Sequence, residues 1–455
     1  MKNGKRSSFS GKLGYVLAAA GASVGLGNIW SFPYLAAKYG GGIFLIIYIV
    51  LALTFGYTMI VAETAIGRMT RKSPVGAFKS FGKKKWLSFG GWINAVIPVL
   101  IVPYYSVIGG WVIKYLVEYF RGNAKQLAED GYFTDFISNG VSTELCFMAF
   151  CAFTLIIIFA GVQNGIERVS KIMMPILIVL SVIIAVYSVT RPGALAGVKY
   201  FLVPNVKNFS WMTVVSAMGQ MFYSLSIAMG ILITFGSYMK KDTAIEDSTR
   251  NVEIFDTGIA IMAGLMIIPA VFAFSGGDPD TLQAGPSLMF ITIPKVFQNM
   301  GFGTVIGIVF FLLVLFAAVT SSIALTESAV STFEDELGWG RKKATVLVGV
   351  IMLALGSLSS LGYGPLAGIK IIGMQFLDLF DFLTNSVMMP IAALLTSLLV
   401  SRVVGIDKIE DEIIHGESAF RRKKVFVVMI KYLCPVFAII ILLSSVANAL
   451  GWIKM

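Results

Sequence analysis

Polar residues interrupt three long apolar stretches of this sequence near their middles. Residues 21–28 read Gly-Ala-Ser-Val-Gly-Leu-Gly-Asn, residues 219–226 read Gly-Gln-Met-Phe-Tyr-Ser-Leu-Ser, and residues 320–322 read Thr-Ser-Ser. Glycines weaken a helix and free backbone carbonyls, while hydroxyl groups add further neutral oxygens. Such oxygens are the ligands that a hard monovalent cation such as sodium needs. The three interruptions therefore predict cation-binding chemistry inside the apolar part of the chain.

Each interruption also has a purely structural interpretation. Gly21 and Gly25 have the spacing of a helix-packing face. The hydroxyls of residues 320–322 can bond back to the preceding turn of their own helix. Packing alone does not explain why Ser23 and Asn28 lie at the same depth as the glycines. The pattern by itself leaves both interpretations open.

Carboxylates at membrane depth add a second chemical signal. A charged group in a lipid-spanning helix is costly unless it is paired, so each one is a candidate for a functional site. Five acidic residues have this placement: Glu63, Asp256, Glu327, Asp378 and Asp381.

Enzyme chemistry, by contrast, has little support in the sequence. The single histidine, His415, lies in a polar segment, and all three cysteines lie in apolar stretches, where they are predicted to be buried side chains. The sequence contains no HExxH, P-loop, complete GxGxxG or CxxC motif. We therefore expect neither an enzyme nor an organic cofactor.

The composition indicates which elements position these residues. Hydrophobic residues make up 57% of the 455 residues and charged residues only 13%, so the chain must be solvated by lipid. Crossing about 30 Å of hydrocarbon takes roughly 20 apolar residues. We expect an all-α polytopic membrane protein with eleven spans, at about residues 13–37, 41–67, 88–113, 145–161, 166–189, 212–238, 252–274, 297–332, 344–358, 369–401 and 427–451.

Basic residues indicate the orientation of these spans. The formal net charge is +11, and Lys and Arg gather in alternate loops, at residues 68–85, 240–250, 341–343 and 421–424. By the positive-inside rule these loops and the N-terminus are cytoplasmic, and an odd number of spans then places the C-terminus outside. The charge therefore orients the chain in a lipid bilayer, and we expect no nucleic-acid partner. The first span lacks the features of a cleavable signal.

The interruptions of the first and sixth predicted spans lie five spans apart. Interrupted spans at matching positions of two halves are typical of transporters built from inverted repeats. We expect one transporter domain over residues 1–455, with a first repeat at 13–189, a second at 212–401 and an additional span at 427–451.

Several separate motifs, in the right order, resemble the neurotransmitter:sodium symporter family and in particular its bacterial eleven-span amino-acid transporters. The match runs from Arg6 to the end of the tenth span. The motifs that carry it are Gly25-Leu26-Gly27-Asn28-Ile29-Trp30 with Phe32-Pro33-Tyr34, Glu63 with Gly67-Arg68, Gly219-Gln220 with Ser224-Leu225-Ser226, Thr320-Ser321-Ser322, and Phe376-Leu377-Asp378 with Asp381-Phe382.

The resemblance implies two sodium sites. The first would consist of the Ser23 carbonyl, Asn28, Ser224 and Asp256, completed by the carboxylate of the substrate. The second would use the carbonyls of Gly21, Val24 and Ala317 with the hydroxyls of Thr320 and Ser321. Mostly neutral oxygen ligands suit a monovalent cation that must leave again.

The resemblance also implies an amino-acid substrate. Monoamine-carrying relatives have an aspartate at the position of Gly25, so glycine here favours an α-amino acid whose carboxylate meets backbone amides and Tyr105. Met229 replaces a phenylalanine of a leucine-carrying relative, and its adaptable side chain favours large hydrophobic or aromatic amino acids. Small aliphatic or other neutral amino acids are the alternative. The predicted pocket residues are Ala22, Ser23, Gly25, Leu26, Gly27, Ile101, Tyr105, Tyr223, Ser224, Ser226, Met229, Ser321 and Leu325.

The gates of the family are partly preserved. The predicted cytoplasmic gate is Arg6 with Asp335, supported by Ser237 and Tyr238. At the outer gate Asp381 is present, but Ser31 replaces the family's arginine, so we expect a water-bridged contact between these two side chains.

A further motif lies in the fifth span. Gly165 and Pro175 match relatives in which this span unwinds to let water reach the second sodium. An ordinary loop glycine and a helix-start proline are the alternative.

These observations predict a sodium-coupled symporter in the plasma membrane of a bacterium. Asp256 supplies a fixed negative charge at the first sodium site, so transport is expected not to need chloride. A channel would need a continuous polar pore, and a membrane enzyme a cluster of catalytic groups; neither pattern is visible. The oligomeric state is not predicted.

Overall fold

The computed structural model describes residues 6–276 and 285–449. Both chain ends, including the predicted end of the last span at residue 451, lie outside these ranges. Within them the fold is helical, apart from two isolated β-bridges. Nine helices there are long and apolar enough to cross a membrane, and a bent pair of helices forms a tenth span. The prediction of an all-α polytopic membrane protein is confirmed.

The nine unbroken spans form where long apolar runs let the backbone satisfy its own hydrogen bonds, as lipid requires. In chain order they are α3 to α4 (Gly42–Thr70), α6 (Lys85–Phe120), α9 (Gly140–Phe159), α10 with its preceding π-helical segment (Val162–Val189), α14 (Ile245–Ser275), α16 (Gly303–Leu337), α17 (Arg341–Leu361), α18 to α19 with the π-helical segment that follows (Phe376–Val404), and α21 to α22 (Lys423–Asn448).

The first span is broken, as predicted. Helix α1 (Lys12–Ser23) ends where Val24 turns to an extended conformation, and a π-helical segment (Gly27–Ser31) leads into α2 (Phe32–Lys38). The two halves are bent by 53°. The glycine-rich stretch thus leaves carbonyls outside the helical hydrogen-bond pattern at mid-span.

The sixth span is broken in the same way. Helix α12 (Trp211–Ser224) and helix α13 (Ile231–Tyr238) are joined by residues 225–230, in which Ser226 and Ala228 adopt left-handed conformations with φ of 53° and 60°. Residues other than glycine rarely adopt this backbone conformation, so the surrounding structure must hold it in place. Two breaks five spans apart are consistent with two inverted halves.

Two predicted spans are too short, since the third continues to Phe120 instead of residue 113 and the seventh begins at Ile245 instead of residue 252. Two others begin later than predicted. The eighth span was expected from residue 297, but Phe297 belongs to a separate short helix, α15 (Ile293–Gln298), and the span begins at Gly303. The tenth was expected from residue 369 but begins at Phe376. In both places apolar residues lie in connecting segments, and hydropathy does not separate these from the span itself.

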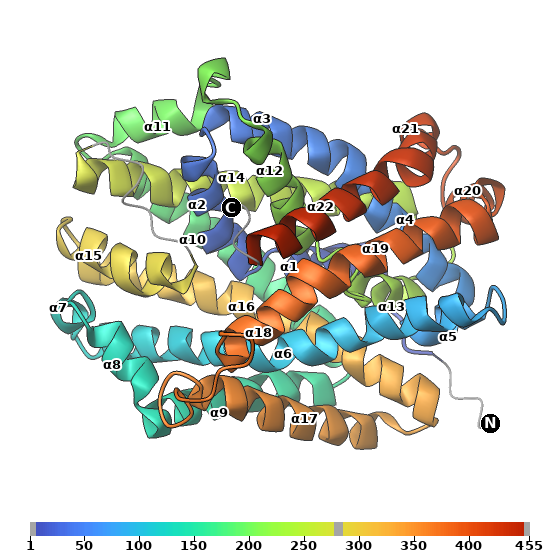
Figure 1. The fold of residues 1–455 in the computed structure, drawn as a ribbon, viewed down its shortest axis with the longest axis horizontal. Coiled ribbons are helices and arrows are strands. Elements are labelled where there is room, and N and C mark those ends of the chain that lie inside the picture. The colour runs from blue at the N-terminus through green and yellow to red at the C-terminus, as the bar shows by residue number, and fades with distance from the viewer. Residues whose placement is uncertain (1–5, 277–284, 450–455) are drawn as a thin grey trace.

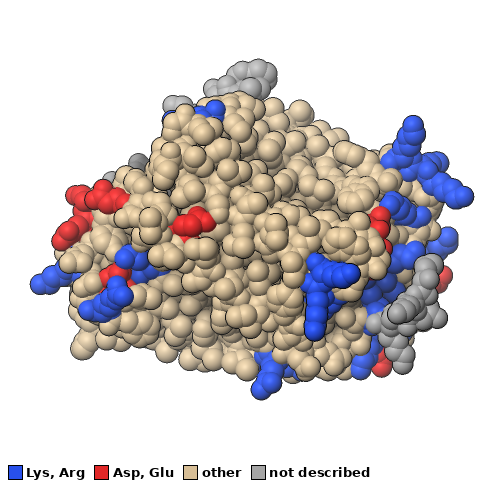
Figure 2. Space-filling model, turned by 90° about the horizontal axis from the view of Figure 1, so that it is seen from below, with Lys and Arg blue, Asp and Glu red and all other residues tan. Residues whose placement is uncertain are grey.

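The spans lie roughly along one axis, with short helices at both ends (Figure 1). One end carries α7 (Ala124–Leu127), α8 (Tyr132–Ser138) and α15; the other carries α5 (Pro74–Lys79), α20 (Ile406–Ile414) and α21 (Lys423–Val428). Figure 2 shows many Lys and Arg side chains at the second end, and a wide uncharged band between the two ends. Among the nine unbroken spans, α6 and α16 have the most enclosed apolar stretches, 78% and 72% buried, so they lie near the centre of the bundle.

Helix α13 packs against α4 (Tyr57–Thr70) with direct backbone contact. A side chain at Gly67 would collide with the carbonyl of Ile233, and one at Gly236 would collide with the carbonyl of Thr64. At the end of α4 the fully buried Arg68 pairs with Glu412 of α20, 2.7 Å away. These contacts connect the inner half of the sixth span to α4 and to α20.

Candidate functional site

A small cavity of ≈ 20 Å³ lies between the two broken spans. Of the predicted pocket residues, Ser224 is the one that does not line it, and Asn28, predicted as a sodium ligand, lines it as well. The lining residues are Ala22, Ser23, Gly25, Leu26, Gly27, Asn28, Ile101, Tyr105, Tyr223, Ser226, Met229, Ser321 and Leu325.

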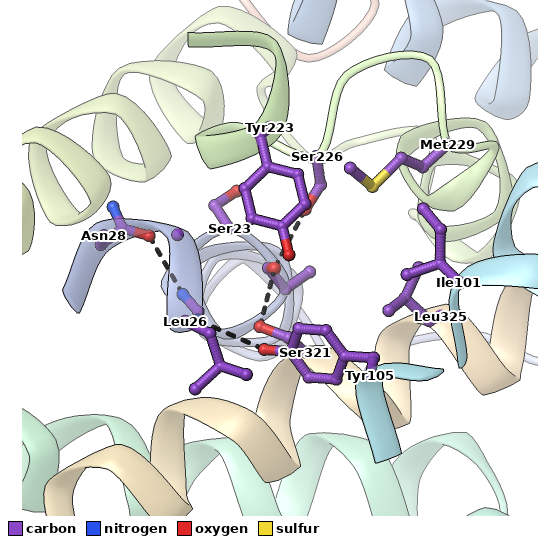
Figure 3. Close-up of a pocket in the computed structure, with 13 residues that line it drawn as sticks. Ser23, Leu26, Asn28, Ile101, Tyr105, Tyr223, Ser226, Met229, Ser321 and Leu325 are labelled. Atoms are coloured by element: carbon purple, nitrogen blue, oxygen red, sulfur yellow. Dashed lines mark hydrogen bonds between the residues drawn. The ribbon is translucent and has the colours of Figure 1, made fainter. Parts of the chain in front are cut away.

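Four elements position these side chains (Figure 3). The two breaks supply residues 22–28 and 223–229. Helices α6 and α16 each add a pair four residues apart, Ile101 with Tyr105 and Ser321 with Leu325, because residues at this spacing share one face of a helix. The site therefore depends on both breaks and on helices α6 and α16.

The cavity has a polar part and an apolar part. Along the first break the Gly25 amide donates to the Asn28 side-chain oxygen at 3.1 Å, and the Leu26 amide donates to the Tyr105 hydroxyl at 3.3 Å. The apolar part is lined by Ile101, Met229 and Leu325. Amide and hydroxyl donors beside an apolar space suit a small molecule with an anionic head and an apolar tail.

Gly25 leaves the space between these parts open. A Cβ atom there would lie 2.7 Å from the Ser321 hydroxyl oxygen and 3.1 Å from the Tyr105 hydroxyl oxygen. Any side chain at this position would therefore fill the polar part of the cavity.

One cluster of buried oxygens surrounds Asp256, which is 0% exposed. Its carboxylate accepts from Asn28 and Ser224, both at 2.9 Å, and from the Tyr48 hydroxyl at 3.0 Å. In the described part of the chain no Lys, Arg or His pairs with it. A buried carboxylate without a cationic partner is costly, so this environment fits a bound cation. Sequence reasoning missed Tyr48.

A second cluster joins the end of α1 to α16. The Ser321 hydroxyl lies 3.3 Å from the carbonyl oxygens of Gly21 and Val24 and 3.1 Å from that of Ala22. The Thr320 hydroxyl instead bonds back to its own helix, at Phe316 and Ala317. Back-bonding is therefore confirmed at Thr320, whereas Ser321 bonds across to the end of α1. Ion binding by the two hydroxyls stays a prediction. The predicted second-site residues all lie at this junction.

The predicted cytoplasmic gate is formed by side chains in contact. Arg6 pairs with Asp335 at 2.6 Å, bonds the Ser237 hydroxyl at 2.9 Å, and lies over the ring of Tyr238, 5.0 Å from its centre. The Tyr238 hydroxyl continues the network by donating to Glu327. The network also includes Ser73, Ser331 and Arg341, which sequence reasoning missed.

A larger cavity of ≈ 580 Å³ lies next to α12. Ser31 and Asp381 both line it, but each has another partner: Ser31 donates to Gln220 at 2.7 Å, and Asp381 accepts from Tyr104 and Asn385. The water bridge between them stays a prediction. Gln220, which sequence reasoning did not predict as the partner of Ser31, also donates to the Gly27 carbonyl.

The fifth span is helical in this structure. Gly165 lies within a π-helical segment (Val162–Glu167), and Pro175 lies inside α10 (Arg168–Val189). The interpretation as a loop glycine and a helix-start proline is therefore wrong. Unwinding of this span stays a prediction.

Two broken spans, a cavity at their junction and buried oxygen clusters beside it define a helical membrane transporter. Residues 6–130 and 118–452 match the sodium:neurotransmitter symporter family. A solved structure of MhsT in complex with L-phenylalanine superposes with a TM-score of 0.86 at 34% identity, covering 97% of this chain and 100% of that one.

Sequence relatives agree with this assignment. The sodium-dependent transporter YhdH of Bacillus subtilis is 34% identical over 98% of this chain and 99% of its own. The human sodium- and chloride-dependent GABA transporter 2 is 26% identical over 90% of this chain and 75% of its own. The chain belongs to the sodium:neurotransmitter symporter family and is a sodium-dependent transporter.

Proposed function

We propose that this chain carries an α-amino acid into the cell together with sodium ions bound at two sites. The observation that supports this most is the position of the cavity, between the Asp256 cluster and the Ser321 junction. Asp256 and Ser224, with Asn28 turned so that its oxygen faces the ion, would hold the first sodium. Ser321 and Thr320, with the carbonyls at the end of α1, would hold the second.

The substrate head would lie along the first break. The amides of Gly25, Leu26 and Gly27 lie there, and the first two, which donate to Asn28 and Tyr105 in this structure, would turn to the carboxylate when it binds. The positive end of the half-helix that follows the break also favours a carboxylate. Tyr105 accepts from one of these amides and keeps its proton free to donate.

We assign the side-chain space to large hydrophobic or aromatic amino acids. Met229, Ile101 and Leu325 give it apolar walls, and a methionine adapts its shape to different guests. The related MhsT structure contains L-phenylalanine.

Small neutral amino acids are the second candidate. The cavity volume of ≈ 20 Å³ has room for little more than one water, since a water needs roughly 10–15 Å³ by this measure. An aromatic side chain therefore requires the surrounding residues to move apart, whereas a small one requires less.

A competition panel tests these assignments. Purified protein in proteoliposomes, under an inward sodium gradient, takes up one labelled amino acid while unlabelled amino acids of increasing size compete. We expect aromatic and large aliphatic amino acids to compete best. Preference for alanine or glycine would favour the second candidate, and the absence of uptake with every amino acid would overturn the proposal.

The proposal includes an orientation in the bacterial plasma membrane. The end with α5, α20 and α21 would face the cytoplasm, together with the gate of Arg6 and Asp335. The cavity lined by Ser31 and Asp381 would then open to the outside. Cysteines placed at the two ends and labelled from one side of intact cells test this orientation.

A further inference from the structure

One side chain separates the small cavity from the large one. Tyr223, the residue before the last one of α12, is the only described residue that lines both. Its ring packs against Gly27, where any side chain would collide with it. Tyr223 therefore lies over the backbone that the proposed function assigns to the substrate carboxylate.

The Tyr223 hydroxyl differs from the other hydroxyls of the small cavity. Ser226 donates to the Ala22 carbonyl at 3.0 Å, Ser321 bonds the carbonyls of the first break, and Tyr105 accepts from Leu26. No hydrogen bond involves the Tyr223 hydroxyl anywhere in the described residues. Figure 3 shows this hydroxyl directed into the cavity, on the side of Ser321 and Tyr105.

An unpartnered hydroxyl inside a cavity needs a partner when the cavity is filled, because a buried polar group without a hydrogen bond is costly. A phenylalanine ring would separate the two cavities equally well. The hydroxyl oxygen of Tyr223 is not needed to separate the cavities, and we therefore expect it to bond a polar atom of the ligand.

We propose that the Tyr223 hydroxyl donates a hydrogen bond to the substrate carboxylate, alongside Tyr105. The inference rests on the proposed function. A phenol is a good donor, and the carboxylate is the part of an amino acid that lies near Gly27 in that assignment. The other end of a hydrophobic substrate would lie in the apolar part of the cavity, beside Ile101 and Leu325, and carries no polar atom that could accept from this hydroxyl.

The contact has a clear signature, because every α-amino acid carries the same carboxylate. Losing a hydrogen bond to a charged group weakens binding by about tenfold to a hundredfold. The variant Tyr223→Phe removes one oxygen and keeps the ring. This variant should therefore weaken the binding of all amino acids by a similar factor and leave their order of affinity unchanged.

The experiment measures sodium-dependent equilibrium binding of a panel of labelled amino acids to purified parent and Tyr223→Phe protein. The control is Tyr115→Phe, which removes a hydroxyl that donates to the Phe290 carbonyl, on a residue that lines neither cavity. Melting temperatures of all three proteins show that they are folded. We expect a uniform loss of about tenfold or more for Tyr223→Phe, and parental binding for the control.

Two results would overturn the inference. Unchanged affinity for every amino acid would mean that the hydroxyl contacts no part of the substrate. A loss confined to some side chains would place the hydroxyl beside the side chain and not the carboxylate. If the parent binds no amino acid in sodium, the proposed function fails first, and this inference fails with it.

Discussion

At the scale of single residues, Asp256 is the buried charge on which the ion assignment depends. Its carboxylate is surrounded by Asn28, Ser224 and Tyr48, all neutral. An opposite charge nearby keeps a carboxylate ionised, so a bound sodium and Asp256 would balance each other without an external anion.

We therefore predict transport without chloride at neutral pH. Asp256→Asn should lose sodium-driven uptake in gluconate by about tenfold or more, because one full charge is missing in a low-dielectric site, and should regain part of it in chloride. Uptake into proteoliposomes in the two anions measures this. Glu144→Gln, which changes a carboxyl bonded to Ser357 in the scaffold, should behave as the parent does. A parent that already requires chloride would contradict the assignment.

Met229 gives a second prediction at this scale, since it lines the apolar part of the cavity. Met229→Phe adds a rigid ring where an adaptable chain was, and should shift preference from aromatic toward smaller aliphatic amino acids. The change in the free-energy difference between the two classes should be about 1–3 kcal/mol, the usual value for a change in pocket size. An unchanged competition profile would show that Met229 does not contact the substrate.

The residues that sequence reasoning missed share one property. Tyr48 lies in an ordinary-looking part of an apolar span, Gln220 was identified only as part of a polar interruption, and Arg341 only as a loop charge. Folding brings them to Asp256, Ser31 and Glu327. Local motifs identified the cavity lining because its residues lie in or beside sequence patterns. Partners from distant segments leave no such pattern.

At the scale of helices, the sequence predicted the spans but not all of their ends. Apolar length identifies a span because lipid requires about 20 residues of it. The segments before α16 and α18 are apolar as well, yet they are turns: Phe302 and Ile372 have φ of 61° and 53°. Hydropathy carries no information about such backbone angles, and this explains why both spans begin later than predicted.

The segment before α1 is held by several helices at once. Arg6 reaches α13 and α16, the Phe9 amide donates to the Tyr238 carbonyl, and Ser10 bonds Glu167 at the start of the fifth span. These contacts connect the helices at the end of the bundle that we assign to the cytoplasm.

Removing the ion pair should open that side. Arg6→Ala or Asp335→Ala should favour inward-open states, weaken sodium-dependent binding from outside by about fivefold or more, and raise labelling of cysteines placed along the cytoplasmic pathway. Lys79→Ala, which breaks an exposed pair with Glu336 at the same end, is the matched control. Equal labelling in the gate variants and the parent would contradict the role of the pair as a gate.

At the scale of the whole molecule, the second ion site would connect α1 to α16, two helices from different halves. An ion bound only by the folded state stabilises it, by about 2.7 kcal/mol at a hundredfold excess over the dissociation constant. Replacing sodium by potassium should therefore abolish concentrative uptake and also lower the melting temperature of the purified protein.

The double variant Thr320→Ala, Ser321→Ala should lose uptake and show a smaller sodium-dependent rise in melting temperature. Ser322→Ala, whose hydroxyl contacts Thr154 in the scaffold, serves as its control. Undiminished accumulation in potassium, or in the double variant, would exclude the second site.

The glycine contact between α4 and α13 has a mechanical consequence. Gly67 and Gly236 bring the two backbones so close together that no side chain fits between them at either position. We expect α4 and α13 to move together, with residues 225–230 as the hinge. The buried ion pair of Arg68 and Glu412 attaches α20 to the end of α4. We therefore expect a rotation of α13 near the cavity to move α20 as well, so that a probe attached to α20 should report it without touching the binding site.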